Sequence, residues 1–236
     1  MRFDAHGLAA FYETPVGQNA RHQIARRLRQ LWPDLTGLRL LGYGFAVPYL
    51  APFLGETERA VALMPAQQGV VIWPAERPLA ALGEEEALPF PDAIFDRILM
   101  VHALEAAEAL RPLMRQVWRV LAPAGRVVIV APNRTSLWAQ VEASPFAYGS
   151  PFSRSQLVQL LTDCLFVPEH WDAALLFPPA QNRNLVRSGA AWERFGRRLW
   201  PGLAGVHLVE ASKTLYGAPT LAPANKRKRA LAGAVR

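Results

Sequence analysis

Residues 38–50 read LRLLGYGFAVPYL, and this stretch decides the fold class. The apolar run at residues 38–41 predicts a short buried strand, and Gly42 and Gly44 predict a tight turn directly after it. Pro48 stands near the first turn of the helix that follows, where the missing N–H of proline costs nothing. In α/β proteins, a strand that enters a helix through a glycine turn is a frequent place for a nucleotide-like ligand.

Predicted strands and helices alternate along the rest of the chain. Further strands are expected over RAVALMP (59–65), VVIWP (70–74), FDRILMV (95–101), GRVVIVAPN (125–133), WDAALLF (171–177) and GVHLVEASKTLYG (205–217). Helices are expected over HQIARRLRQLW (22–32), ALRPLMRQVWRVLAPAG (109–125), SRSQLVQLLTDCLF (153–166) and AAWERFGRRLW (190–200). This alternation predicts an α/β fold with a doubly wound, mostly parallel sheet, helices on both faces and an antiparallel edge. Ligands of such sheets bind beyond the carboxyl ends of the strands, where the strand order reverses.

The composition is that of a globular protein with one sizeable core. The 236 residues are 51% hydrophobic and 19% charged, and the single cysteine, Cys164, excludes an internal disulfide framework and fits a reducing compartment. Neither a signal-peptide core nor an apolar run of about 18 residues, as a membrane helix needs, is found in the sequence. We therefore expect a cytoplasmic, bacterial protein without membrane insertion.

Much of the net charge of +7 belongs to the carboxyl-terminal segment NKRKRALAGAVR (225–236). This segment holds five of the 26 basic residues and no acid, so the rest of the chain is close to neutral. We interpret the segment as a solvated, disordered end, and we do not expect nucleic-acid binding. The expected organisation is an N-terminal helical cap (1–36), an α/β domain (37–216) and a basic tail (217–236).

Several familiar ligand sites do not fit the glycine turn. A dinucleotide site needs a third small residue and an acid after the second strand, but these positions hold Val47 and Met64. A phosphate-binding loop is excluded because no Lys-Ser or Lys-Thr follows the glycines. The sequence also lacks a serine-hydrolase elbow and the Cys and His pairs of a zinc site.

The second half of the strand–helix pattern resembles a known family. EEEALPFPDAIFDRILMVHALE (84–105), followed by MRQVWRVLAPAGRVVIVAPN (114–133), is similar to class I methyltransferases that use S-adenosylmethionine. The similarity is to the type 11 methyltransferase domain, whose branch includes quinone-biosynthesis enzymes. FYETPVGQ (11–18) and ASPFAYGSPFSRSQL (143–157) resemble a bacterial subgroup with the same altered turn. The resemblance implies a Rossmann-like methyltransferase fold with a seven-stranded sheet.

The resemblance also implies a cofactor site, although two of its usual acids are missing. The family's first acid and third glycine stand where this chain has Leu40 and Ala46, and its ribose-binding acid stands at Met64. The acid that faces the adenine amine matches Glu84, with Glu85 as the alternative. The expected cofactor-binding residues are therefore Gly42, Tyr43, Gly44, Met64, Glu84, Glu85, Val101 and His102.

Methyl transfer from a sulfonium is an in-line displacement, so the protein has to align the acceptor and, where needed, remove a proton. It requires no metal. We expect His102, Tyr12 and Tyr148 as the catalytic residues, and Asn133 and Trp138 as further candidates for contact with the acceptor. Packing roles for the two tyrosines and for Trp138, and a turn role for Asn133, remain open alternatives.

Two functional hypotheses follow. The first is an S-adenosylmethionine-dependent methyltransferase acting on an unidentified small molecule. The second is a catalytically inactive relative that serves as a regulatory or protein-binding module, because both Leu40 and Met64 replace acids of the family. The second hypothesis includes a protein partner, and the first a small-molecule acceptor.

Overall fold

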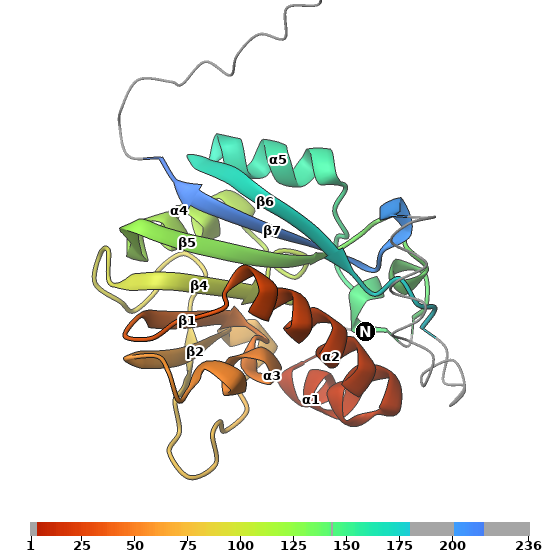
Figure 1. Ribbon diagram of the computed structural model, residues 1–236, viewed down its shortest axis with the longest axis horizontal. Helices are drawn as coiled ribbons and strands as arrows, with labels where there is room; N and C mark the ends of the chain where they lie inside the picture. The colour runs from red at the N-terminus through yellow and green to blue at the C-terminus, as the bar shows by residue number, and fades with distance from the viewer. Residues whose placement is uncertain (1–3, 143, 180–200, 215–236) are drawn as a thin grey trace, which may run out of the picture.

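The computed structural model describes residues 4–142, 144–179 and 201–214 (Figure 1). These residues form one seven-stranded sheet with helices on both faces. The helix expected at 190–200 and the basic tail lie outside the described residues, and the division of the chain at residue 36 stays a prediction. Within the described ranges, no helix combines the length and the apolar character needed to cross a membrane.

The sheet is mostly parallel, as the sequence predicts. Its strands are β1 (Arg39–Gly44), β2 (Arg59–Pro65), β3 (Ala80–Gly83), β4 (Phe95–Val101), β5 (Leu121–Pro132), β6 (Phe166–Ala174) and β7 (Val206–Lys213). They lie in the order β3-β2-β1-β4-β5-β7-β6, so the order reverses between β1 and β4. Strands β1 to β5 are parallel, whereas β7 pairs antiparallel with both β5 and β6. The expected antiparallel edge is confirmed.

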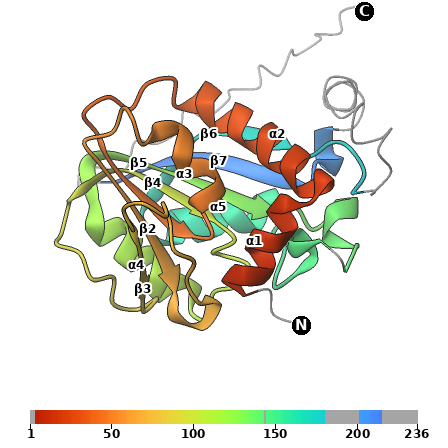
Figure 2. The same ribbon diagram turned by 90° about the horizontal axis from the view of Figure 1, so that it is seen from below.

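Two layers of helices cover the sheet (Figure 2). Helices α1 (Ala5–Glu13), α2 (Pro15–Leu31) and α3 (Val47–Leu50) pack on one face, and α4 (Leu110–Val120) and α5 (Arg154–Asp163) pack on the other. In β4, Leu99 and Val101 face the first layer, while Ile98 and Met100 face the second. Burial on both faces explains why this strand is a continuous apolar run rather than an alternating one.

A local signal begins one helix, and a tertiary contact fixes the end of another. Ser153 and Gln156 form the capping box that begins α5, as their spacing predicts. The C-cap of α2 is Trp32, whose indole N–H donates to Glu210 Oε1 over 2.9 Å in the buried interior. This bond fastens the end of α2 to β7.

The strand expected over residues 70–74 is wrong. This segment is a loop, and the third strand is instead Ala80–Gly83, which pairs with β2. Val70, Val71 and Trp73 are apolar because they pack against the core cluster, and not because they pair with a strand. A short apolar run looks the same in both situations, since its composition reports burial and not backbone pairing.

The two glycines of the opening stretch have separate packing roles. Gly44 has φ +77°, and a Cβ added there would lie 2.4 Å from the carbonyl oxygen of Val101. That same carbonyl accepts the Phe45 N–H over 2.8 Å, so β1 and β4 meet tightly at this point. A Cβ at Gly42 would lie 2.7 Å from the side chain of Leu50 in α3. The turn is therefore a close junction of β1, α3 and β4.

Substitution of Gly44 by alanine should destabilise the protein more than substitution of Gly37. Both residues have positive φ, but the space around the Gly37 Cβ position is empty to 4 Å. Gly37→Ala should cost about 1–2 kcal/mol of unfolding free energy from backbone strain alone, and Gly44→Ala should cost more because of the added contact with Val101. Urea unfolding of the two variants measures this difference, and equal losses would contradict the packing role of Gly44.

Candidate functional site

The strand register brings the predicted cofactor positions together at the carboxyl ends of the parallel strands, which we call the carboxyl edge of the sheet. Gly44, the last residue of β1, pairs with Val101, the last residue of β4. In β2, Met64 follows the residue that pairs with Tyr43, so it lies at the same level. Glu84 directly follows the end of β3. These are carboxyl ends of parallel strands, beside the point where the strand order reverses.

The side chains at these positions differ in their burial and in the face of the sheet on which they pack. Met64 and Val101 are fully buried in the apolar cluster under α1–α3, whereas Tyr43 packs on the opposite face of the sheet. Glu84 is exposed, but Glu85 is buried and its Oε2 accepts the backbone N–H of Glu108 over 3.1 Å. Of the two predicted acids, Glu84 is therefore the one that faces solvent.

A buried chain of hydrogen bonds lies at the same carboxyl edge. The Tyr49 hydroxyl donates to the Tyr12 hydroxyl over 2.9 Å, and Tyr12 Oη lies 2.8 Å from His102 Nε2. On the other side of the imidazole, His102 Nδ1 lies 3.2 Å from Glu105 Oε1. All four side chains are at most 5% exposed. The chain joins α3, α1, the end of β4 and the loop that follows it.

One arrangement of protons satisfies every contact in this chain. Because Tyr49 donates to Tyr12, the proton of Tyr12 is left to bond to His102 Nε2. Nε2 then acts as an acceptor, and the proton on Nδ1 is donated to the carboxylate of Glu105. The imidazole is neutral in this arrangement, and both of its nitrogens are engaged within the protein.

The backbone at His102 is strained and is held in place from several sides. Its φ of +49° lies in the left-handed region, which costs about 1–3 kcal/mol for such a residue unless the surroundings enforce it. The carbonyl of His102 accepts from Gln68 Nε2 over 3.2 Å, in addition to the two bonds of the ring. Strain that is enforced in this way is typical of functional sites.

The tyrosines of the site stay protonated at neutral pH. Burial raises the pKa of Tyr12 well above its usual value, and the neighbouring Tyr49 raises it further. Burial likewise raises the pKa of Tyr49 and of Tyr43. Tyr12 therefore acts here as a neutral hydrogen-bonding group.

A void of about 10 Å³ adjoins the hydrogen-bonded chain. It is lined by Leu8, Gln68, His102, Glu105, Ala106, Pro145 and Tyr148. The structure thus brings the three predicted catalytic residues together: His102 and Tyr148 line the void, and Tyr12 bonds to His102. Their catalytic roles stay predictions.

Sequence reasoning missed Glu105, Gln68 and Tyr49. Glu105 carried a signal, because it is the glutamate of the Leu-Glu pair that follows β4 in the family framework. Gln68 and Tyr49 carried none, since only the folded chain brings Gln68 to His102 and Tyr49 to Tyr12.

The segment at residues 144–152 fixes the position of Glu105. Gly149 has φ +74°, and a Cβ there would lie 2.0 Å from the carbonyl oxygen of Glu105. The next residue, Ser150, donates its N–H to that same carbonyl over 2.9 Å. Only glycine can lie this close to the carbonyl of Glu105, which explains the glycine at position 149.

The two other acceptor candidates are engaged elsewhere. Asn133 Nδ2 donates to the carbonyls of Gly202 and Ala204, so its amide closes a turn. Trp138 is 1% exposed, and its indole N–H donates to the carbonyl of Phe177 over 2.7 Å. Both residues have the structural roles that the sequence left open as alternatives.

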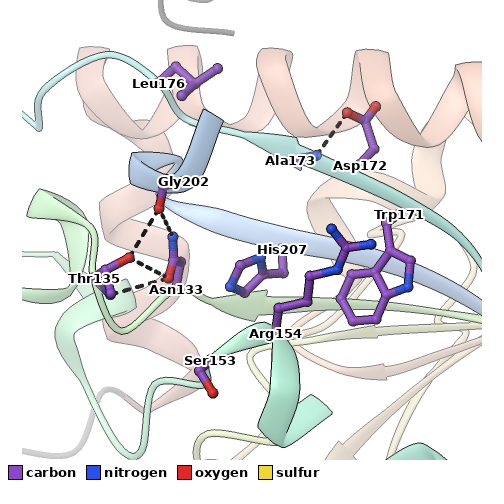
Figure 3. Close-up of a pocket in the computed structure, with 10 residues that line it drawn as sticks. All are labelled: Asn133, Thr135, Ser153, Arg154, Trp171, Asp172, Ala173, Leu176, Gly202 and His207. Carbon is purple, nitrogen blue, oxygen red and sulfur yellow. Dashed lines mark hydrogen bonds between the residues drawn. The ribbon is translucent and has the colours of Figure 1, made fainter. Parts of the chain in front are cut away.

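A larger cavity of about 520 Å³ lies where β6 and β7 meet the start of α5 (Figure 3). The Arg154 guanidinium stacks on the Trp171 ring at 4.7 Å, and His207 stands beside them. Burial, and then the positive charge of Arg154, lower the pKa of His207, so its ring is neutral near pH 7. The cavity combines an apolar wall with a neutral imidazole, and it is separate from the void at Glu105.

A cluster of potential metal ligands lies elsewhere on the sheet. Among the described residues, Glu169, His170 and Glu210 bring ligand atoms within 4.8 Å of one another. Arg126 pairs with both carboxylates, so a positive charge already occupies this position. The cluster is a charged network on β5, β6 and β7.

The strand order, with its antiparallel β7 and its glycine turn after β1, defines the class I methyltransferase fold. Comparison with solved structures agrees. A methyltransferase dependent on S-adenosylmethionine from Archaeoglobus fulgidus superposes with a TM-score of 0.60, at 16% identity, over 82% of this chain and 94% of that one. A Haloferax volcanii protein solved with the Trm112 methyltransferase activator gives a TM-score of 0.64, at 15% identity, over 84% and 92%.

Comparison of sequences gives a family match and a relative. Residues 41–129 match the family model described as a methyltransferase domain. Over 230 residues, the chain is 27% identical to a 2-phytyl-1,4-naphtoquinone methyltransferase of Synechococcus elongatus. That match covers 84% of this chain and 93% of the relative.

Removal of the Tyr12 hydroxyl should destabilise the protein, whereas removal of the Tyr43 hydroxyl should not. Tyr12→Phe leaves the buried Tyr49 hydroxyl and His102 Nε2 without their partner and should cost about 1–3 kcal/mol. The buried Tyr43 hydroxyl has no partner among the described residues, so Tyr43→Phe should be neutral or stabilising. Denaturant unfolding measures the stability of both variants, and equal losses of stability would contradict the role of the hydrogen-bond chain.

Stability should fall steeply above about pH 10, the usual pKa of tyrosine. Tyr12, Tyr43 and Tyr49 have raised pKa values in the folded state, so the unfolded state loses these protons first and gains stability as the pH rises. Phenolate absorbance should therefore appear for these residues together with unfolding. Their titration while the circular dichroism stays native would contradict this picture.

Proposed function

We propose that this protein is an S-adenosylmethionine-dependent methyltransferase that acts on a small molecule. The proposal rests on one combined observation. Residues 41–129 match a methyltransferase domain, and the register of β1 and β4 brings the predicted cofactor positions together at the carboxyl ends of these strands. At that edge the predicted cofactor positions lie beside a buried Tyr–His–Glu chain. When bound, the cofactor would supply a methyl group on a sulfonium, and the protein would orient the acceptor and take up its proton.

The described residues fit parts of this cofactor. Glu84 stands exposed after β3, where it can accept from the adenine amine, and the turn from Gly42 to Ala46 leads from β1 to the edge. Met64 offers no carboxylate to the ribose hydroxyls. Loss of such a charged acceptor costs about 1.5–3 kcal/mol, so we expect affinity more than tenfold weaker than with an acid there.

The acceptor is proposed only as a small molecule. The Synechococcus relative is named for a naphthoquinone, which makes 1,4-naphthoquinols the first acceptors to assay. Aromatic rings near His102 support an apolar acceptor, because Phe146 lies 4.9 Å from its imidazole and Phe45 stacks on Tyr12.

A non-catalytic relative is the second candidate, and one specific observation favours it. Leu40 and Met64 replace acids of the family, and both are completely buried in the apolar core. If they remove the cofactor site, the fold serves as a regulatory or protein-binding module. The Haloferax structure, solved with an activator protein, supports a protein partner for a fold of this kind.

Calorimetric titration with S-adenosylmethionine and S-adenosylhomocysteine tests the proposal. Both should bind, and Glu84→Ala should weaken binding about tenfold, because the adenine amine loses a charged acceptor. Glu86→Ala removes an exposed acid two residues away and should leave the affinity unchanged. Absence of binding at millimolar ligand would favour the non-catalytic alternative.

A further inference from the structure

Two buried oxygens at the void next to His102 lack hydrogen-bond partners. Within the described part of the chain, neither Glu105 Oε2 nor Gln68 Oε1 has a donor. Glu105 is 5% exposed and Gln68 is 8% exposed, so solvent does little to compensate. A buried polar atom without a partner costs about 1–3 kcal/mol, and more when it is charged. Such atoms persist where a ligand or an ordered water completes them.

The remaining polar atoms of both side chains are already used, so their orientation is fixed. Glu105 Oε1 is held by His102 Nδ1, and Gln68 Nε2 donates to the carbonyl of His102. Both side chains line the same void together with His102. His102 has no ring nitrogen left for a ligand, because Tyr12 engages Nε2. The free lone pairs at this site therefore belong to Glu105 and Gln68.

The size of the void limits what can occupy it. About 10 Å³ accommodates roughly one water-sized group. Two acceptor oxygens, one of them on a carboxylate, select a group that donates hydrogen bonds. Ala106 and Tyr148, both only partly buried, also line the void, so one side of it is close to solvent. A terminal O–H or N–H can enter while the rest of its molecule stays outside.

We propose that Glu105 Oε2 and Gln68 Oε1 bind the O–H or N–H group of the methyl acceptor, and that Glu105 is the catalytic residue that takes its proton. This inference rests on the proposed methyltransferase function. It assigns the base to Glu105, a residue that the sequence did not single out, in place of His102. It also defines the acceptor as a molecule whose nucleophilic oxygen or nitrogen carries a hydrogen.

The reaction balances without another reactant. A lone pair of the acceptor oxygen or nitrogen forms the bond to the methyl carbon, and the carbon–sulfur bond breaks with its electron pair staying on sulfur. The sulfonium becomes a neutral thioether. The proton of the acceptor moves to Glu105 Oε2, and the carboxylate becomes a neutral carboxylic acid.

Nuclear magnetic resonance on the full chain tests this site without a known acceptor. The side-chain amide of Gln68 serves as the reporter, and its resonance is assigned by its loss in Gln68→Ala. The probes are phenol and methylammonium, which donate hydrogen bonds, and anisole and tetramethylammonium, which do not. We expect a saturable shift of the Gln68 resonance with phenol, methylammonium or both, and none with the matched non-donors. The donor that succeeds identifies an O–H or an N–H acceptor.

A matched pair of variants tests the role of the carboxylate. Glu105→Gln should weaken binding of the effective donor about tenfold, because the charge-assisted bond is lost. Glu86→Gln, which removes an exposed acid, should leave it unchanged. Equal shifts with phenol and anisole, no shift with either donor, or unchanged binding in Glu105→Gln would overturn the proposal. The comparison of phenol with anisole uses the unaltered chain and does not depend on how a variant folds.

Failure of this inference is distinguishable from failure of the proposed function. A protein that binds S-adenosylmethionine but shows no donor effect at Gln68 overturns the acceptor site alone. A protein that binds no S-adenosylmethionine overturns the methyltransferase function, whatever the Gln68 resonance shows.

Discussion

The hydrogen-bond chain from Tyr49 through Tyr12 to His102 is the interaction on which the site depends. All of its side chains are buried, so each polar group must bond to another protein group and not to bulk water. Its members come from α3, from α1 and from the end of β4, which fixes the N-terminal helices against the carboxyl edge of the sheet. The left-handed backbone of His102 is tolerated because these bonds, and that from Gln68, hold it.

The glycine turn has two roles in this structure. Gly42 and Gly44 are needed for packing, since a Cβ at either would collide with Leu50 or with the carbonyl of Val101. The same turn lies at the carboxyl end of β1, where we propose that the cofactor binds, and the domain match covers this region. The packing of β1, α3 and β4 therefore requires these two glycines, whatever ligand binds beside the turn.

Much of the fold could be predicted from the sequence, because most of its strands and helices leave a local pattern. The continuous apolar run of β4 and the capping box of α5 are examples. The third strand could not be placed, since Ala80–Gly83 is short and partly exposed and its pairing with β2 is a tertiary contact. For the same reason, Gln68 and Tyr49 carry no local signal. They become site residues only when the chain folds, because Tyr49 then bonds to Tyr12 and Gln68 to His102.

We propose that the carboxyl edge of β1, β2 and β4 binds S-adenosylmethionine, and a crystal structure with S-adenosylhomocysteine is the decisive experiment. We expect the adenine beside Glu84, the amino-acid end of the ligand near the turn at residues 42–46, and its sulfur on the side of the edge nearest the Glu105 void. A saturated crystal in which this edge holds no ligand, with the Tyr12–His102 bond intact, would overturn the proposed cofactor site.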